Sequence, residues 1–216
     1  MPEPFHPIAN TIFRLVLLGG GVLFALVLWI GYLVVRSPYE MLQNVPRDQP
    51  LQFSHEHHAG GLGIDCRYCH VSVEYSSFAD IPPTSICMHC HSQMWAVAPA
   101  VEPVRASYRT GRSIQWTKVY ELPDFVYFDH SIHIHKGIGC SSCHGRVDHM
   151  PLTWQQPNLT MAWCLNCHTN PQLYVRPESE VFNMDYKPPA DQAALGRRLV
   201  HEYRIQSLTS CSICHR

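Results

Sequence analysis

The sequence predicts a mostly irregular and α-helical fold packed around haem, of the class III cytochrome c type, with one N-terminal transmembrane helix. Three observations lead to this prediction. The motif C-x-x-C-H occurs five times, the chain has 17 prolines, and residues 15–35 form an uncharged apolar run. Outside that run only about 36 residues remain for each motif, which is too few for a separate hydrophobic core.

Two cysteines three positions apart, followed at once by a histidine, form the attachment signature of a c-type haem. The thiols become thioethers on the haem vinyl groups, and the histidine is presented to one face of the iron as the proximal ligand. All 10 cysteines belong to such motifs, which we number in chain order: motif 1 (Cys66, Cys69, His70), motif 2 (Cys87, Cys90, His91), motif 3 (Cys140, Cys143, His144), motif 4 (Cys164, Cys167, His168) and motif 5 (Cys211, Cys214, His215). The prediction is therefore five covalently bound haem c groups.

Zinc sites and disulfides are the alternative uses of so many cysteines. A disulfide framework gives no reason for a histidine after every pair. Zinc usually draws two cysteine pairs, or a cysteine pair and a distant histidine pair, into one site, and five identical units do not divide in that way. The pattern favours haem.

Two segments have the same layout and predict a duplicated two-haem module, over residues 53–91 and 128–168. Each begins with F-x-H-x-x-H, continues to one C-x-x-C-H motif and ends with a second; motif 5, at 211–215, closes the chain. A haem restricted to electron transfer needs a sixth, distal ligand, usually His or Met. The recurring spacing predicts that the distal ligands are His55, His58, His130 and His133, the first of each pair serving its own haem and the second a neighbour.

One iron is left without a recurring histidine. Met150 is the predicted thioether ligand for it, and a His/Met pair raises a haem potential relative to two histidines. Packing in a core is the ordinary role of a methionine. His201, Met161 and His149 stay open as alternatives.

Residues 15–36 are predicted to form a transmembrane signal-anchor helix, because the apolar run would span about 31 Å as a helix. Residues 1–14 would then be a short cytoplasmic terminus, 37–52 a proline-punctuated linker, and 53–216 the pentahaem domain. Covalent haem attachment takes place outside the cytoplasmic membrane, so the haem domain is expected on the periplasmic or outer face of a single-pass inner-membrane protein.

The rest of the chain offers less. A formal net charge of −1 gives no argument for binding nucleic acid. No acid–base pair or vacated iron ligand predicts a catalytic residue. Between the modules, Ile114 to Tyr120 suggests at most a short strand, and Asp191 to Tyr203 an amphipathic helix.

Longer strings carry a resemblance to a known family. F-S-H-E-H-H, I-P-P-T-S-I-C-M-H-C-H, L-P-D-F-V-Y-F-D-H-S-I-H, L-T-M-A-W-C-L-N-C-H and the terminal L-T-S-C-S-I-C-H-R resemble the membrane-anchored pentahaem cytochrome c subunit of bacterial alternative complex III. The resemblance implies a quinol-oxidising complex with an iron–sulfur subunit and polytopic quinol-binding membrane subunits. It also implies a monohaem cytochrome c or another soluble carrier as the outlet. Many members of the family have His where this chain has Tyr120.

The predicted function is electron transfer, from a quinol-oxidising respiratory or photosynthetic membrane complex to a periplasmic acceptor. In this role the chain is not catalytic by itself, since the redox chemistry belongs to the cofactors. Two alternatives are a stand-alone membrane-anchored quinol dehydrogenase and, less favoured, a terminal reductase with a reactive haem iron.

Overall fold

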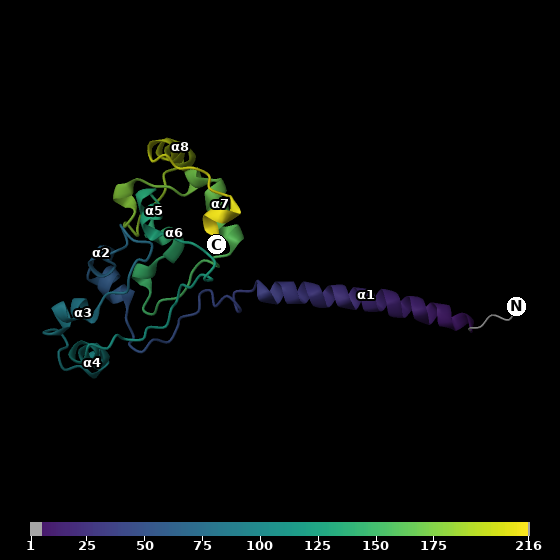
Figure 1. Ribbon diagram of the computed structural model, residues 1–216, viewed down its shortest axis with the longest axis horizontal. Helices are drawn as coiled ribbons and strands as arrows, with labels where there is room; N and C mark the ends of the chain where they lie inside the picture. The colour runs from purple at the N-terminus through teal and green to yellow at the C-terminus, as the bar shows by residue number, and fades with distance from the viewer. Residues whose placement is uncertain (1–5, 216) are drawn as a thin grey trace. The chain divides into compact units, whose positions relative to one another are not determined.

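The computed structural model describes residues 6–215 and divides the chain into two units, with the boundary between Gln43 and Asn44. The first unit contains one long helix and the second contains all the C-x-x-C-H motifs (Figure 1). The units are described separately below.

Helix α1 spans Pro7–Val35. The His6 ring accepts a hydrogen bond from the Ile8 backbone N–H, and proline at the first helical position suits a helix start. These two signals explain why the helix begins before residue 15, where the apolar run starts. Its stretch Ile8–Val35 is long and apolar enough to cross a membrane, and its apolar side chains are exposed within this unit.

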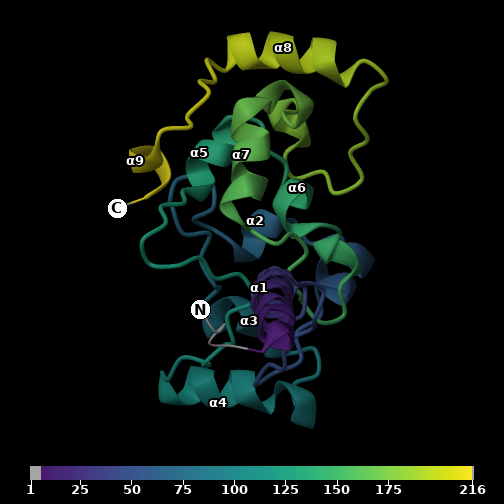
Figure 2. The same ribbon diagram turned by 90° about the vertical axis from the view of Figure 1, so that its right-hand side faces the viewer.

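The second unit consists of short helices joined by irregular segments (Figure 2). Among residues 44–215 there is no β-sheet, only an isolated antiparallel bridge between Val126 and His215. The remaining helices are η1 (Glu56–Gly61, a π-helix), α2 (Cys66–Cys69), α3 (Thr84–His91), η2 (Pro99–Val101), α4 (Glu102–Thr110), α5 (His130–His135), α6 (Cys140–His144), η3 (Val147–His149), α7 (Met161–Thr169), η4 (Pro171–Leu173), η5 (Glu178–Glu180), α8 (Gln192–Glu202) and α9 (Cys211–Cys214). This confirms the predicted mostly helical and irregular fold.

Each motif lies on a helix or at its end, namely α2, α3, α6, α7 and α9. The Asp65 carboxylate caps α2 by accepting from the Arg67 backbone N–H, and the Thr160 hydroxyl caps α7 in the same way for Trp163. One helical turn brings the two thiols and the histidine of a motif to the same end of the element, as attachment to a single porphyrin requires.

Three segments between the motifs compare differently with the sequence predictions. Helix α8 forms where an amphipathic helix was predicted, its start capped by the Asp191 side chain. The short strand considered at Ile114 to Tyr120 does not form, because no neighbouring strand pairs with it in the described residues. Helix α4 was not predicted; Glu102 pairs there with Arg105 and Arg109 along one face.

The apolar core of the second unit is small. Val73, Ile134 and Val181 form its main cluster, and Cys140 and Phe182 pack against them. The cluster therefore joins the segment after motif 1 to the start of motif 3. Several large aromatic side chains, Trp95 and Phe125 among them, are exposed, which fits a fold whose interior is completed by porphyrin.

Candidate haem sites

Four of the five motif histidines face another histidine across a constant gap. The ring centroids of His55 and His70 are 6.5 Å apart, and those of His130 and His144 are also 6.5 Å apart. The separation is 6.2 Å between His58 and His91 and 6.1 Å between His133 and His168. The structure thus brings together every recurring histidine of the two modules with one motif histidine.

The gap fits an iron ion between two imidazoles. A metal–nitrogen bond of about 2.0 Å and about 1.1 Å from the nitrogen to the ring centre place two opposed ring centres about 6.2 Å apart. The four observed separations, 6.1 to 6.5 Å, are close to that value. The residues present therefore fit haem held by two histidines at motifs 1 to 4.

The two modules repeat in the orientation of the rings as well as in sequence. The planes of the first pair in each module are nearly parallel, at 9° and 11°, whereas those of the second pair are crossed, at 63° and 71°. Phe53 packs edge-on against His55 and stacks on His58, with centroids 4.9 and 4.5 Å away. Phe128 repeats both contacts with its own two histidines, at 4.7 and 4.6 Å. One phenylalanine therefore sets both distal rings in each module.

Backbone carbonyls fix the tautomer of most of these rings. A carbonyl oxygen only accepts hydrogen bonds, so a ring Nδ1 bonded to it must carry the proton, and Nε2 keeps its lone pair for the metal. The structure shows such bonds from five of the facing histidines: His58 to Ser54 O (2.8 Å), His70 to Asp80 O (2.7 Å), His91 to Met94 O (3.1 Å), His130 to Ser77 O (2.8 Å) and His133 to Asp129 O (2.6 Å).

Burial also favours the neutral, metal-binding form of the rings. It lowers the pKa of His55 to about 4, helped by the neighbouring His70 and His58. It lowers the pKa of His144 to about 4, with His130 as the next cause. A neutral imidazole is the form that ligates a metal.

The first histidine of module 1 has a partner that sequence reasoning missed. The Nδ1 atom of His55 lies 2.9 Å from the Thr153 hydroxyl, 98 positions away in the chain. With Nε2 directed to the metal, Nδ1–H donates to the Thr153 oxygen. Ser77, which serves His130, was missed for the same reason: no local pattern marks a residue that orients a distant ring.

Motif 5 differs from the other four. Among the described residues the ring next to His215 is Phe125, with centroids 5.8 Å apart and planes tilted by 33°. The backbone N–H of Tyr127 donates to Cys214 O at 2.8 Å. The thiols of motif 4 are close by, since the Cys214 thiol raises the pKa of Cys164 after the larger effect of burial.

The candidates for the fifth distal ligand lie in different places. Met150 is only 2% exposed, and its carbonyl accepts from the Glu56 N–H beside η1. His149 contacts Arg146 and Asp148. Figure 2 shows α9 and α6, which leads directly into that segment, on opposite sides of the unit. His201 lies on α8, and Met161, 64% exposed, is the first residue of α7.

Tyr120, where many members of the resembled family have His, does not face motif 5. Its ring centroid lies 4.4 Å from that of His144, which already faces His130. Its hydroxyl accepts from the Gln156 N–H at 3.1 Å, and burial raises its pKa. Position 120 therefore belongs to the surroundings of motif 3.

Three further histidines serve no facing pair. His89 Nδ1 meets the Tyr68 hydroxyl at 3.0 Å, His135 Nε2 donates to the Glu74 carbonyl at 2.8 Å, and His57 stacks near Trp95.

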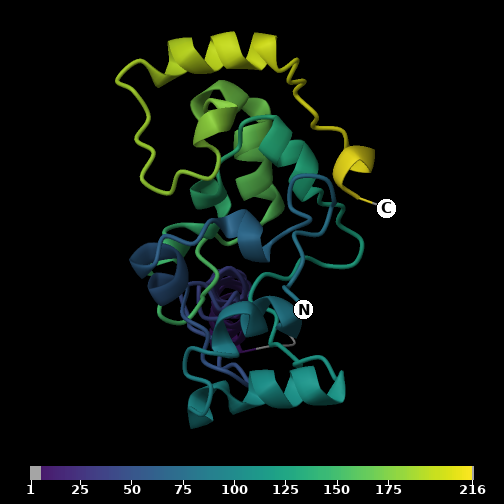
Figure 3. The same cartoon turned by 90° about the vertical axis from the view of Figure 1, so that its left-hand side faces the viewer.

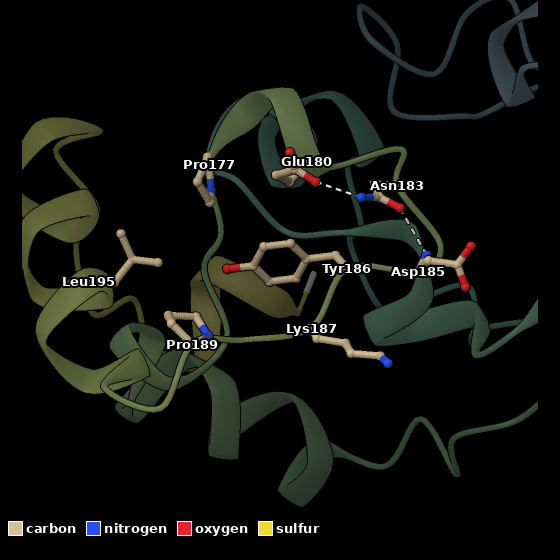
Figure 4. A pocket seen from close by; sticks show the side chains of 8 residues that line it. All are labelled: Pro177, Glu180, Asn183, Asp185, Tyr186, Lys187, Pro189 and Leu195. Atoms are coloured by element: carbon tan, nitrogen blue, oxygen red, sulfur yellow. Dashed lines mark hydrogen bonds between the residues drawn. The ribbon is translucent and has the colours of Figure 1, made fainter.

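A hollow beside η5 and α8 is unrelated to the motifs. Figure 4 shows the Tyr186 ring at its centre, between Pro177 and Pro189, with Asp185 and Lys187 at one side. It is lined by none of the residues predicted to bind haem.

The 10 cysteines form no disulfide bonds with one another. Within residues 6–215 no group of three or more His, Cys, Asp or Glu side chains is placed to hold a metal ion by itself.

Comparison with known proteins agrees with this chemistry. No family model matches the chain. A curated protein of Nitratidesulfovibrio vulgaris, the multihaem cytochrome c subunit of a menaquinone reductase, is 36% identical over 106 residues. The match covers 49% of the chain and 49% of that relative, so the chain spans about half the length of the protein it matches.

Proposed function

We propose that this chain binds five covalent haem c groups and is the electron-transfer subunit of a quinone-linked membrane complex. The observation that carries the proposal is the set of four histidine pairs with centroids 6.1 to 6.5 Å apart. The likeness to a subunit of a menaquinone reductase supports the quinone link. Haem, when bound, supplies reversible one-electron chemistry.

The chain's own residues supply attachment, ligation and orientation. The cysteines of each motif form the thioethers, and the histidine that follows them is the proximal ligand. His55, His58, His130 and His133 are the distal ligands of motifs 1 to 4. The hydrogen bonds at Nδ1 hold each ring in place and make it a better donor to iron, as outer-shell partners do in other metal sites.

For motif 5 we propose Met161 as the distal ligand in place of Met150. Helix α7 begins at Met161, one turn before Cys164, and the segment before motif 5 contacts the same helix, because the Ser207 hydroxyl donates to the His168 carbonyl at 2.8 Å. Met150 is instead buried beside η1, near motif 1. A thioether is a soft ligand that suits haem iron and gives a higher potential than a second histidine.

The wider setting follows the resemblance to alternative complex III. Residues 15–36 would anchor the chain in a bacterial inner membrane, with 1–14 in the cytoplasm, 37–52 as a linker and the haem domain, 53–216, on the periplasmic face. Partners would be an iron–sulfur subunit, polytopic quinol-binding subunits and a monohaem cytochrome c or another soluble carrier. Electrons would run from quinol to that carrier.

A second candidate reverses the direction of flow. The relative's name, a menaquinone reductase, favours electrons arriving from a periplasmic donor and leaving to a quinone. Purified complex in detergent distinguishes the two directions. Quinol-dependent reduction of the haems supports the first, whereas reduction by a soluble cytochrome followed by quinone-dependent reoxidation supports the second.

Three measurements test the core of the proposal. A pyridine haemochrome assay should give five haems per chain, and fewer would overturn the cofactor count. Low-temperature EPR of the oxidised protein should show two classes of low-spin signal, one from parallel and one from crossed imidazole pairs. A stoichiometric high-spin signal would favour the terminal reductase. Purified chain that oxidises quinol alone would favour the stand-alone dehydrogenase.

A further inference from the structure

The order in which the motifs neighbour one another in space differs from their order in the sequence. Contacts between each pair of neighbouring motifs give this spatial order. Motifs 1 and 2 are neighbours. Phe53 contacts the distal histidines of both. Tyr68, inside motif 1, meets His89, inside motif 2, with 3.0 Å between hydroxyl oxygen and Nδ1.

Motifs 3 and 4 repeat that arrangement in the second module. Phe128 contacts the distal histidines of both. Each module is therefore a pair of neighbouring haem sites with one phenylalanine between their distal ligands.

The two modules meet through motifs 1 and 3. His55, the distal ligand of motif 1, is oriented by Thr153 of the second module at 2.9 Å. His130, the distal ligand of motif 3, is oriented in turn by Ser77 O of the first module at 2.8 Å. Val73 and Ile134 belong to the one apolar cluster against which Cys140 packs. Each module thus holds the first distal ring of the other.

Motif 5 joins the row at motif 4. The Ser207 hydroxyl, four residues before motif 5, donates to the His168 carbonyl at 2.8 Å. The Tyr127 N–H donates to Cys214 O at 2.8 Å, and the next residue, Phe128, stacks on the distal ligand of motif 4. Figure 3 shows α9 at the margin of the unit, on the last stretch of the chain.

We propose that the five haem sites form one unbranched row in the order 2–1–3–4–5, so that electrons enter and leave at motifs 2 and 5. The exposure of the thiols supports this independently. Cys90 of motif 2 and Cys211 of motif 5 are exposed, and the other eight cysteines are half-buried. Motif 1, the first in the chain, is internal. The inference rests on the proposed haem binding and not on the quinone reaction.

Electrostatic coupling between neighbouring haems tests the order. Reducing one haem makes reduction of a haem beside it harder, and the effect fades along the row. A His55→Met variant raises the potential of motif 1, so that this haem is reduced before its neighbours. In the order 2–1–3–4–5, the ratio of reduced to oxidised haem at fixed potential should then fall roughly tenfold at both motif 2 and motif 3. Motif 5 should be unaffected.

The matched variant is His58→Met, at the other distal position of the same module. It raises the potential of motif 2, which as an end of the row has motif 1 as its single neighbour. An EPR-monitored redox titration of the full holoprotein measures the haem potentials of both variants. The EPR signal of parallel histidine pairs belongs to motifs 1 and 3, and that of crossed pairs belongs to motifs 2 and 4. If the haem potentials show coupling between motifs 2 and 3 and none between motifs 1 and 3, the haems are arranged in the order 1–2–3–4–5, as in the sequence. That result would overturn the proposal.

If the His55→Met variant loses its haem, a His130→Met variant provides the same test. In the proposed row it should lower the potentials of the haems at motifs 1 and 4. In a row that follows the sequence, it should lower those at motifs 2 and 4. The titration involves no quinone turnover, so the order stands or falls separately from quinol oxidation. A haem count below five would instead count against the proposed cofactor content.

Discussion

The hydrogen bond between His55 and Thr153 gives the sharpest prediction from a single contact. Thr153→Val replaces the hydroxyl by a methyl group of similar size. The Nδ1–H of His55 then loses its acceptor at 2.9 Å. A ring that donates this bond is a stronger electron donor to iron and favours the ferric state. The potential of the motif 1 haem should therefore rise.

The size of the shift follows from the net worth of the bond. A buried hydrogen bond contributes about 0.5–1.5 kcal/mol. If all of it is lost from the ferric state alone, a one-electron couple moves by roughly 20–65 mV, since 59 mV corresponds to a tenfold change. Any loss shared by the ferrous state makes the shift smaller. The expected rise is thus a few tens of millivolts.

EPR-monitored potentiometry of the holoprotein measures this shift on the parallel-plane signals. Motif 3 is an internal reference, because His130 is oriented by a backbone carbonyl that the substitution leaves intact. The control variant Thr110→Val also removes a threonine hydroxyl, one that donates to Ala106 O on α4. A fall in the motif 1 potential, or an equal rise at motif 3, would refute the reasoning.

Three other predictions each rest on one substitution, and two of them have a matched control variant. Met161→Leu should abolish the near-infrared sulfur-to-iron charge-transfer band of ferric haem and make motif 5 high-spin, whereas Met150→Leu should keep the band; the opposite result would restore Met150 as the ligand. Gly137→Ala should cost about 3 kcal/mol in chemical unfolding, because its φ is 75° and a Cβ would lie 2.3 Å from the Arg176 carbonyl oxygen. Gly111→Ala, with φ of 67° and open space around it, should cost about 1 kcal/mol, and equal losses would contradict the clash. Arg176→Gln removes a buried positive charge that packs against Gly139, beside motif 3. Because a nearby positive charge favours the reduced haem, the potential of motif 3 should fall, by at most roughly 70 mV in the same titration. A rise in this potential would refute the prediction.

The sequence was sufficient for the local parts of the site. Two cysteines and a histidine at fixed spacing need only one helical turn to form a site. The geometry of each motif is therefore determined by residues that are adjacent in the sequence. The repeat of F-x-H-x-x-H was equally informative, because equal spacing in two copies predicts equal roles. The structure places all four of these histidines opposite a motif histidine, as that reasoning expects.

Contacts between distant segments could not be predicted in this way. Thr153 and Ser77 look like ordinary loop residues, and their role depends on how the modules dock. Helix α4 was not predicted, although Val101 and Val104, which stand three positions apart at its start, are both buried. It ends at Gly111, which has a left-handed conformation. The distal ligand of motif 5 stays a prediction, because its place depends on where motif 5 folds back.

The proposed row explains why a duplicated module can serve as a wire with two different ends. Two copies joined head to tail would give the chain order and expose the first motif. Here each copy orients the other's first distal histidine, which places both first motifs at the centre and both second motifs outward. Such a pair alone would be symmetric, with equivalent ends. Motif 5 adds to one side only, and its ring neighbour is Phe125 in place of a second histidine. A different distal ligand there would give that end a different potential, and the asymmetry needed to direct electron flow would then come from the unduplicated part of the chain.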